Sequence, residues 1–231
     1  MREVYKNWAG NFEFSARRVH YPESVAQVQD LVKSYEKVGV LGSRHSFNSI
    51  ADSPGDLISL EKMGPQFVLD REHARVRVGA ATKYGHLAQF LFSEGYALHN
   101  LASLPHISVA GACATGTHGS GGKNGNLSTA VSGLAFVTAA GEVVEISRER
   151  DGDRFHGAVV ALGGLGIVTA VSLELLPSFD VSQVVYENLP LAQLEEHFDE
   201  IMSSTYSVSL FTDWQDDSID QVWLKHRGDY A

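Results

Sequence analysis

Two stretches of the sequence combine glycine, hydroxyl side chains and histidine in a way that suits ligand chemistry. The first, residues 42–48, reads Gly-Ser-Arg-His-Ser-Phe-Asn and directly follows the apolar segment Val38–Leu41. Ligands commonly bind where a buried strand runs into a loop. The stretch matches neither the Walker A pattern nor the dinucleotide fingerprint, so alone it indicates a phosphate or cofactor site only weakly. His45 could equally be a histidine that hydrogen-bonds nearby backbone.

The second stretch, residues 101–125, is dominated by glycine, alanine, serine, threonine and histidine and has no apolar period. We expect one long loop here, and loops above ~12–15 residues are usually functional. Its glycines would let backbone N–H groups approach an anion such as a diphosphate: Gly111, Gly116, Gly119, Gly121 and Gly122. The alternative is a flexible surface loop, which the scarcity of charged residues disfavours.

Two other chemistries receive less support. His45, His106 and His118 could bind a metal ion, but no HxH or HxxxH spacing on a regular element favours this, so we expect no metal. A hydrolase using Ser43 or Ser103 is disfavoured because the Gly-x-Ser-x-Gly pattern is absent.

Composition limits the classes of partner. The chain has 231 residues, a formal net charge of −10 and no basic cluster, which argues against nucleic acid and anionic membranes as partners. Small neutral or organic substrates fit better. The single cysteine, Cys113, excludes an intramolecular disulfide and a cysteine-based zinc cluster. Because Met1–Trp8 lacks an apolar core and no run of ~18 apolar residues occurs, we expect a cytoplasmic protein.

Periodic segments surround both stretches and must position them. Apolar residues at helical spacing follow Pro22 and predict a helix that ends near Gly39. The other elements expected before residue 101 are strands at Val38–Leu41, Leu57–Leu60 and Ala74–Val78 and a helix from Tyr84 to Gly95.

Regular structure resumes after residue 125. We expect a hairpin of two half-buried strands, Val131–Thr138 and Glu142–Ser147, then a helix around Phe155–Leu162 and a strand at Ile167–Leu175. From Val181 onward the pattern predicts a strand, one helix and two strands. These four elements are too few for a finished domain, so the apolar faces at Leu194, Phe198 and Val208 would need a cover from elsewhere.

Three motifs in order resemble the vanillyl-alcohol-oxidase type of FAD flavoprotein and, within it, the alditol (xylitol) oxidases. They are Val40–Asn48, Ala102–Gly111 and Ala114–Gly121. The resemblance runs from Asn7–Asn11 to the end of the chain and includes Tyr206–Trp214 and Gln221–Lys225.

The resemblance implies an α+β fold: a two-lobed FAD-binding domain of the vanillyl-alcohol-oxidase (PCMH) type at residues 10–177. Residues 178–231 would be the first part of an α/β substrate domain and would be incomplete, since relatives continue for about as many residues again. We expect residues 38–48 and 101–125 to converge on one cleft. The cofactor would be FAD, attached covalently through His45 to the 8α-methyl carbon of the flavin. Arg44 departs from the pattern, because a small residue is usual beside this histidine.

The resemblance also assigns the remaining flavin contacts. The contacts around the diphosphate would be Val40, Leu41, Gly42, Ser43, Arg44 and Ser46. The contacts along the rest of the cofactor would be Ser108, Gly111, Thr115, Gly116, Thr117 and His118. The contact at the adenosine end would be Ile167. Ser103 corresponds to a serine that faces both flavin and substrate, and it is the catalytic candidate.

The activity implied is oxidation of the primary alcohol of a polyol such as xylitol or sorbitol to the aldose, with molecular oxygen reduced to hydrogen peroxide. Two alternatives remain: an aldonolactone oxidase or dehydrogenase of the same family, and an FAD-binding fragment without turnover. Ser103–His106 and Thr212–Trp214 favour the alditol type. The uncovered C-terminal faces suggest self-association as a further possibility.

Overall fold

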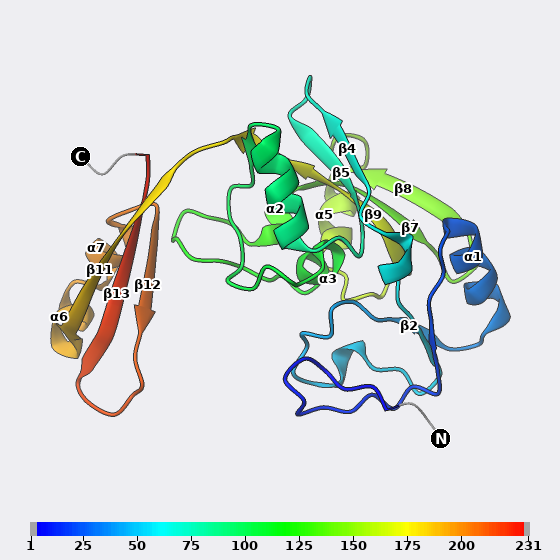
Figure 1. Ribbon diagram of the computed structural model, residues 1–231, viewed down its shortest axis with the longest axis horizontal. Coiled ribbons are helices and arrows are strands. Elements are labelled where there is room, and N and C mark those ends of the chain that lie inside the picture. The colour runs from blue at the N-terminus through cyan, green and yellow to red at the C-terminus, as the bar shows by residue number, and fades with distance from the viewer. Residues whose placement is uncertain (1–3, 229–231) are drawn as a thin grey trace.

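A computed structural model describes residues 4–228 and arranges them around separate sheets. Figure 1 shows two lobes built on sheets at one end of the molecule and a C-terminal sheet at the other. Mixed helices and strands in this order are the α+β class expected from the sequence. Among the described residues, no helix is both long enough and apolar enough to cross a membrane.

The first lobe is a three-stranded parallel sheet. Its strands, in spatial order, are β1 (Val19–His20), β3 (Asp56–Ile58) and β2 (Val38–Val40). Helix α1 (Val25–Ser34) connects β1 to β2; the Ser24 side chain caps it, and Val28 and Val32 are buried on its inner face. The helix ends earlier than expected, since Tyr35 is already extended and the chain must straighten to enter β2.

The second lobe is a five-stranded antiparallel sheet. In spatial order it contains β4 (Phe67–Asp70), β5 (Arg75–Gly79), β9 (Ile167–Glu174), β7 (Val131–Val137) and β8 (Val143–Ser147). The predicted hairpin is confirmed, but the half-buried character is wrong for β7, whose seven residues are all buried. The reason is that Leu134 packs into one hydrophobic cluster and Val137 into another, so both faces of the strand are covered.

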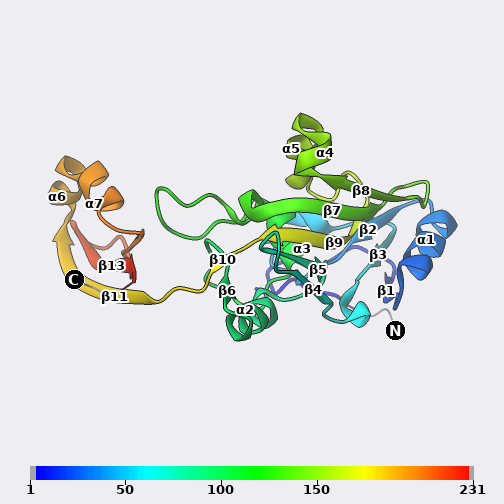
Figure 2. The same cartoon turned by 90° about the horizontal axis from the view of Figure 1, so that it is seen from above.

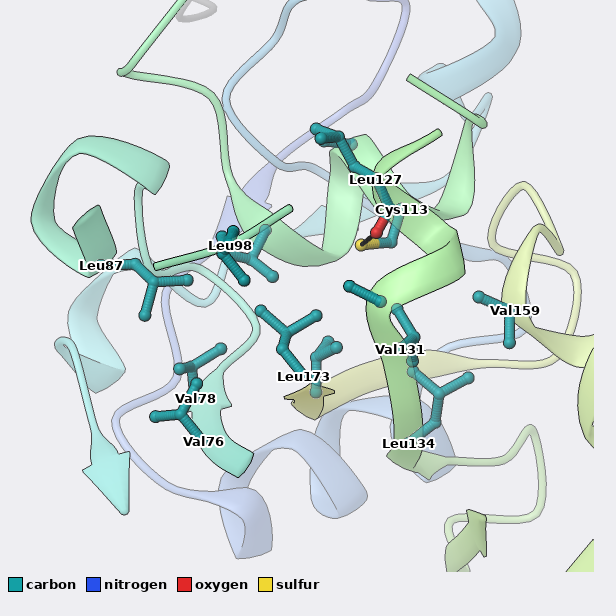
Figure 3. Close-up of a cluster of buried hydrophobic side chains, with 14 of the residues drawn as sticks. Val76, Val78, Leu87, Leu98, Cys113, Leu127, Val131, Leu134, Val159 and Leu173 are labelled. Carbon is teal, nitrogen blue, oxygen red and sulfur yellow. Dashed lines mark hydrogen bonds between the residues drawn. The ribbon is translucent and has the colours of Figure 1, made fainter. Parts of the chain in front are cut away.

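The main core lies against this second sheet (Figure 3). Leu87 of α2 (Tyr84–Ser93), Cys113 of α3 (Val109–Ala114) and Val159 of α5 (Asp153–Val159) pack with Val131 and Leu173 of the sheet. The shorter elements are α4 (Arg148–Asp151), β6 (Tyr96–Ala97), β10 (Leu176–Pro177), and the 3-10 turns Ser49–Ala51, Glu61–Met63 and Leu127–Ala130.

Helix α3 corrects the expectation of one long loop at residues 101–125. Val109, Ala112 and Cys113 recur at helical spacing and are buried, but small side chains made this period hard to recognise. The helix ends in a Schellman motif, in which Gly116 N donates to Cys113 O at 3.2 Å and Thr117 N donates to Ala112 O at 3.0 Å. Gly116 has φ 65°, the left-handed conformation that this motif requires and that glycine adopts readily, so the helix terminus explains why glycine occurs here.

The C-terminal part is a three-stranded antiparallel sheet with two short helices on one face (Figure 2). It comprises β11 (Val181–Pro190), β13 (Ser218–Arg227) and β12 (Ser207–Phe211), with α6 (Leu191–Glu196) and α7 (Phe198–Ser203). Two helices replace the single one expected, because His197 leaves helical geometry between them. Leu194 and Val208 pack together in this part's own small core, so the expectation that both need an outside cover is wrong.

Three side-chain hydrogen bonds tie residues 206 and 207, at the start of β12, to the loops before and after α3. Tyr206 Oη donates to His99 O, the hydroxyls of Ser120 and Ser207 are 2.5 Å apart, and Asn124 Nδ2 donates to Tyr206 O at 3.2 Å. The domain limits at residues 10, 177 and 231 stay predictions, and Ala231 lies outside the described residues. The change of sheet falls between the end of β10 and the start of β11.

Two glycines offer a matched test of the fold. Gly166 has φ 134°, and a Cβ there would lie 2.2 Å from Val137 O; Gly157 is helical, with nothing within 4 Å of a Cβ. We expect Gly166→Ala to lower the free energy of unfolding by about 1–3 kcal/mol and Gly157→Ala to raise it by about 0.5–1 kcal/mol. Urea denaturation of both variants measures this, and equal effects of the two substitutions would contradict the geometry at Gly166.

Candidate functional site

The two stretches singled out from the sequence meet in the structure. Ser108 N, at the start of α3, donates to Ser43 Oγ at 3.1 Å. A Cβ at Gly42 would lie 2.9 Å from Ser108 Oγ, and one at Gly111 would lie 2.8 Å from the same atom. At Gly42 this close approach comes from the other stretch, whereas at Gly111 it comes from the N-cap residue of the same helix, and a side chain at either position would require Ser108 Oγ to move. The expectation that the two stretches converge is confirmed.

The stretch after β2 presents a run of free backbone donors. Within the described part of the chain, the N–H groups of residues 42–46 donate to no protein acceptor. Arg44 lies in the left-handed region with φ 63°, which turns the chain here. Successive unpaired N–H groups in such a turn form a concave anion-binding site without needing basic side chains. This segment therefore has the donors to hold a diphosphate.

His45 lies among aromatic neighbours. Its Nδ1 is 3.0 Å from Ser43 O, whereas its Nε2 is buried and has no hydrogen-bond partner among residues 4–228. The Trp8 ring stacks on the imidazole with centroids 5.1 Å apart and planes at 22°. The ring of His106 is 4.7 Å away at 54°. A buried polar atom without a partner needs an explanation, and a bound group supplies one.

The surroundings of His45 favour its neutral form. Burial lowers the pKa of His45 most, the nearby His106 lowers it further and Lys83 contributes in the same direction; the backbone hydrogen bond to Ser43 opposes them. The net pKa lies below the ordinary value of 6.5, so the imidazole is uncharged at pH 7 with a lone pair available. Burial also lowers the pKa of Lys83, and the Arg44 guanidinium adds to this while Glu61 opposes it.

Other predicted flavin contacts gather near these groups. Thr115 Oγ1 donates to Gly111 O at 3.0 Å, and its hydroxyl is 3.2 Å from that of Thr117. The turn before Ile167 reaches both lobes, since Leu162 N donates to Ala114 O at 3.1 Å and a Cβ at Gly163 would lie 3.6 Å from the Val40 side chain. Ile167 itself is buried in a hydrophobic cluster, and this leaves only its backbone for a ligand. Leu41 is also buried, and its N–H pairs with Ile58 O.

Ser103 and His118 are both exposed. His118 Nδ1 is 2.8 Å from Gly119 O. Among the described residues, neither side chain forms a hydrogen bond with residues 42–48, the His45 segment. Their assigned roles therefore stay predictions. Residues 4–228 contain no group of three side chains placed to bind a metal ion, and His118 is not among the neighbours of His45 and His106.

The interpretation of the loop glycines needs correction at two positions. A Cβ at Gly119 would lie 2.4 Å from Asn100 Oδ1, and one at Gly121 would lie 2.4 Å from Asn124 Nδ2 and 2.5 Å from Tyr206 O. Packing within the chain therefore accounts for both glycines, and ligand approach is not needed to explain them.

Sequence reasoning gave no role to Asn7, Trp8 or Lys83, which all lie near the His45 segment. Asn7 Nδ2 donates to Ser46 O at 2.9 Å, and Trp8 N donates to Arg44 O at 2.8 Å. The only signal in the sequence was that Asn7–Asn11 formed part of the family resemblance, because nothing local shows that residues 7 and 46 are neighbours.

A surface hollow of about 430 Å³ lies elsewhere. It is bordered by Val32, Lys37, Asp52 and Ala139, at the start of β2, whereas the His45 segment follows the end of that strand. The hollow includes none of the residues predicted to bind flavin.

The fold has two lobes, and the loop with free N–H groups follows strand β2 of the first lobe. These features define a flavoprotein of the FAD-binding, vanillyl-alcohol-oxidase (PCMH) class. Cholesterol oxidase of Brevibacterium sterolicum has this arrangement at a TM-score of 0.83 and 17% identity, covering 99% of this chain and 48% of that one. Residues 16–147 match the family described as FAD binding domain, and the chain belongs to that family.

Two curated relatives narrow the comparison. The chain is 45% identical to alditol oxidase from a Streptomyces species, over 99% of this chain and 55% of that protein. It is 33% identical to L-gulonolactone oxidase of Mus musculus, over 79% of this chain and 42% of that protein. The chain spans about half the length of the curated relatives it matches.

The electrostatic setting of His45 predicts its titration. We expect histidine ring NMR signals of the flavin-free protein to give His45 a pKa below 6.5, with protonation only at more acid pH. His106→Gln should raise this pKa, and Lys83→Met should raise it by less, because His106 has the larger effect. A His45 that titrates at or above 6.5, or one unaffected by His106→Gln, would contradict the assignment.

Proposed function

We propose that the protein oxidises the primary alcohol of a polyol such as xylitol or sorbitol to the aldose, using FAD and molecular oxygen. The observation that carries this proposal is the similarity to alditol oxidase along 99% of the chain, which includes the C-terminal sheet as well as the FAD-binding fold. The lactone-oxidising relatives match shorter shares of the chain at lower identity, 79% for the mouse enzyme and 80% for D-arabinono-1,4-lactone oxidase of Saccharomyces cerevisiae.

The residues present fit FAD. In this proposal the N–H groups of residues 42–46 bind the diphosphate, and Ser108, Gly111 and Thr115–His118 line the remainder. The close approach of Gly42 to Ser108 supports this, since a side chain at position 42 would displace the Ser108 hydroxyl where the two stretches meet. When bound, FAD would supply the acceptor for the substrate hydride and the route for two electrons to oxygen, while the protein would supply orientation and electrostatics.

We further propose that His45 is the covalent link to the flavin. Its neutral imidazole and its buried, unpartnered Nε2 support a nucleophilic role, and its other nitrogen is close to Ser43 O. A bond from imidazole to the flavin ring withdraws electrons from the ring and raises its potential, which favours oxidation of an unactivated alcohol. Ser103 has an exposed hydroxyl and is proposed to orient the substrate hydroxyl over the flavin. Overall, one alcohol and one oxygen molecule give one aldehyde and one hydrogen peroxide.

An aldonolactone oxidase is the second candidate. It is favoured by the similarity to L-gulonolactone oxidase and to D-arabinono-1,4-lactone oxidase, at 33% and 31% identity. These relatives share the FAD-binding part, so the choice of substrate separates the two proposals and flavin content does not.

Two proposals concern the surroundings of the protein. A cytoplasmic location is supported by the lone Cys113, which is buried; burial raises the pKa of its thiol to about 11 against a smaller lowering by the Tyr84 hydrogen bond. Such a thiol is unreactive and needs no disulfide partner. Self-association is supported by Val185 and Phe211, exposed apolar residues of the C-terminal sheet.

A substrate panel tests the proposed activity. We expect the purified flavin-containing protein to release peroxide from xylitol and sorbitol with kcat/KM at least about 10-fold above that for gulonolactone and galactonolactone, which corresponds to about 1.4 kcal/mol of transition-state discrimination. Faster turnover of the lactones would support the second candidate, and turnover of neither class by flavin-loaded protein would refute both.

Replacing His45 tests the link. We expect His45→Ala to abolish flavin fluorescence that survives a denaturing gel, while native protein still binds FAD reversibly because the N–H groups of residues 42–46 remain. His73→Ala, an exposed histidine that pairs with Asp70, serves as the matched control and should keep the covalent flavin. Mass spectrometry of the peptide that contains His45 identifies the adduct directly, and covalent flavin in His45→Ala would show that the link lies elsewhere.

A further inference from the structure

The N-terminal arm, residues 5–14, folds as a small hairpin of its own. Asn7 N donates to Phe12 O and Phe14 N donates to Tyr5 O, both at 2.9 Å, and Lys6 pairs with Glu13 as an isolated bridge. Figure 1 shows this segment in dark blue, beside the chain that follows β2. Phe14 is buried with Leu41 in one hydrophobic cluster, which anchors the arm to the end of β2.

The arm holds the backbone on both sides of His45. Trp8 N donates to Arg44 O at 2.8 Å, and Asn7 Nδ2 donates to Ser46 O at 2.9 Å. These are the carbonyls immediately before and after His45. Two hydrogen bonds from adjacent residues of the arm therefore bracket the histidine.

The Asn7 side chain is built into this position. It is 4% exposed, its Oδ1 accepts from Phe12 N at 3.1 Å, and its Nδ2 also donates to Asn11 Oδ1 at 2.7 Å. The bond from Phe12 N defines which end of the amide is oxygen, so Nδ2 must face Ser46 O. A buried amide with this many partners is a specific connection between the arm and the His45 segment.

The Trp8 side chain, in contrast, is 57% exposed, so burial in a core does not explain its placement. Its ring stacks on the His45 imidazole at 5.1 Å and lies 5.7 Å from the His106 ring. The indole thus contacts one face of the imidazole, and the backbone bonds on either side prevent the histidine from moving away from it.

We infer that Asn7 and Trp8 are positioning residues that orient the His45 imidazole for its bond to the flavin. This inference rests on the proposed role of His45 as the covalent link. In that step one carbon–nitrogen bond forms, the imidazole and the 8α-methyl group each lose one hydrogen, and the two electrons and two protons reduce oxygen to hydrogen peroxide. A misplaced nucleophile can cost such a reaction roughly 10²-fold in rate.

Trp8 gives the sharper test, because its exposure allows substitution without a loss of core packing. Flavin-free protein from riboflavin-starved cells is mixed with FAD, and in-gel fluorescence after denaturation measures the rate of covalent attachment. We expect Trp8→Ala to slow attachment at least about 10-fold at saturating FAD, and Trp8→Phe, which keeps an aromatic ring, to stay within about 3-fold of wild type. Phe92→Ala, an exposed aromatic of α2, is the matched control and should leave the rate unchanged.

The outcomes separate orientation from general stability. Attachment at the wild-type rate in Trp8→Ala would overturn the inference. So would equal slowing in Trp8→Ala and Trp8→Phe accompanied by an equally weakened reversible affinity for FAD, because that pattern indicates only a structural contribution. Asn7→Ser, which retains a hydroxyl but cannot span both partners, should slow attachment in the same direction as Trp8→Ala.

A second measurement needs no flavin and therefore distinguishes failure of this inference from failure of the proposed link. In a Trp214→Phe, Trp223→Phe background Trp8 is the remaining tryptophan, and a protonated imidazole stacked on an indole quenches its fluorescence. We expect Trp8 emission to fall on acidification, and we expect His45→Gln to remove at least half of that fall. His106 and Lys83 also act on the imidazole, so His106→Gln is measured in parallel. If wild type binds FAD reversibly but never attaches it, the proposal that His45 is the covalent link is refuted. If His45→Gln leaves the quenching curve unchanged, Trp8 does not contact His45 in solution and the positioning inference is overturned.

Discussion

The hydrogen bond from Ser108 N to Ser43 Oγ joins two segments that are 65 residues apart, and much of the candidate site depends on it. Ser108 is 2% exposed, so its N–H would otherwise be buried without a partner, at a cost of about 1–3 kcal/mol. The Ser43 hydroxyl that accepts this bond is also 3.2 Å from His45 Nδ1. The Ser43 side chain thus connects the start of α3, the turn at residues 42–46 and the histidine, and where it joins them a Cβ at Gly42 would lie 2.9 Å from Ser108 Oγ.

The apolar periodicity of the sequence predicted the elements whose inner faces carry large apolar side chains. It failed where the buried side chains are small or where the contacting residues are far apart in the sequence. Helices α1 and α2 and strands β5 and β9 were predicted and are present, but α3 was missed because Ala112 and Cys113 give a weak apolar signal. The two stretches of the site were found from composition and family resemblance. The arm was not, since its contact with Ser46 spans 39 residues and no local pattern reports it.

Arg44 illustrates how a departure in sequence acquires a physical meaning. The family resemblance showed only that a small residue is usual beside the histidine. The structure places Arg44 at φ 63°, where a side chain costs about 1–2 kcal/mol relative to glycine. The turn nevertheless keeps its N–H groups free, and the guanidinium acts on the electrostatics of the site by lowering the pKa of Lys83. Compared with a small residue, Arg44 therefore adds a positive charge to the site.

The arm also sets an order of assembly during synthesis. Its bond to Ser46 closes a span of 39 residues, the bond between Ser43 and Ser108 closes 65, and that between Tyr206 and His99 closes 107. Chains emerge from the ribosome N-terminus first, and shorter spans lose less entropy on closing. The histidine can thus be bracketed on the ribosome before α3 exists, and the turn is already shaped when the second lobe arrives to complete the proposed flavin site.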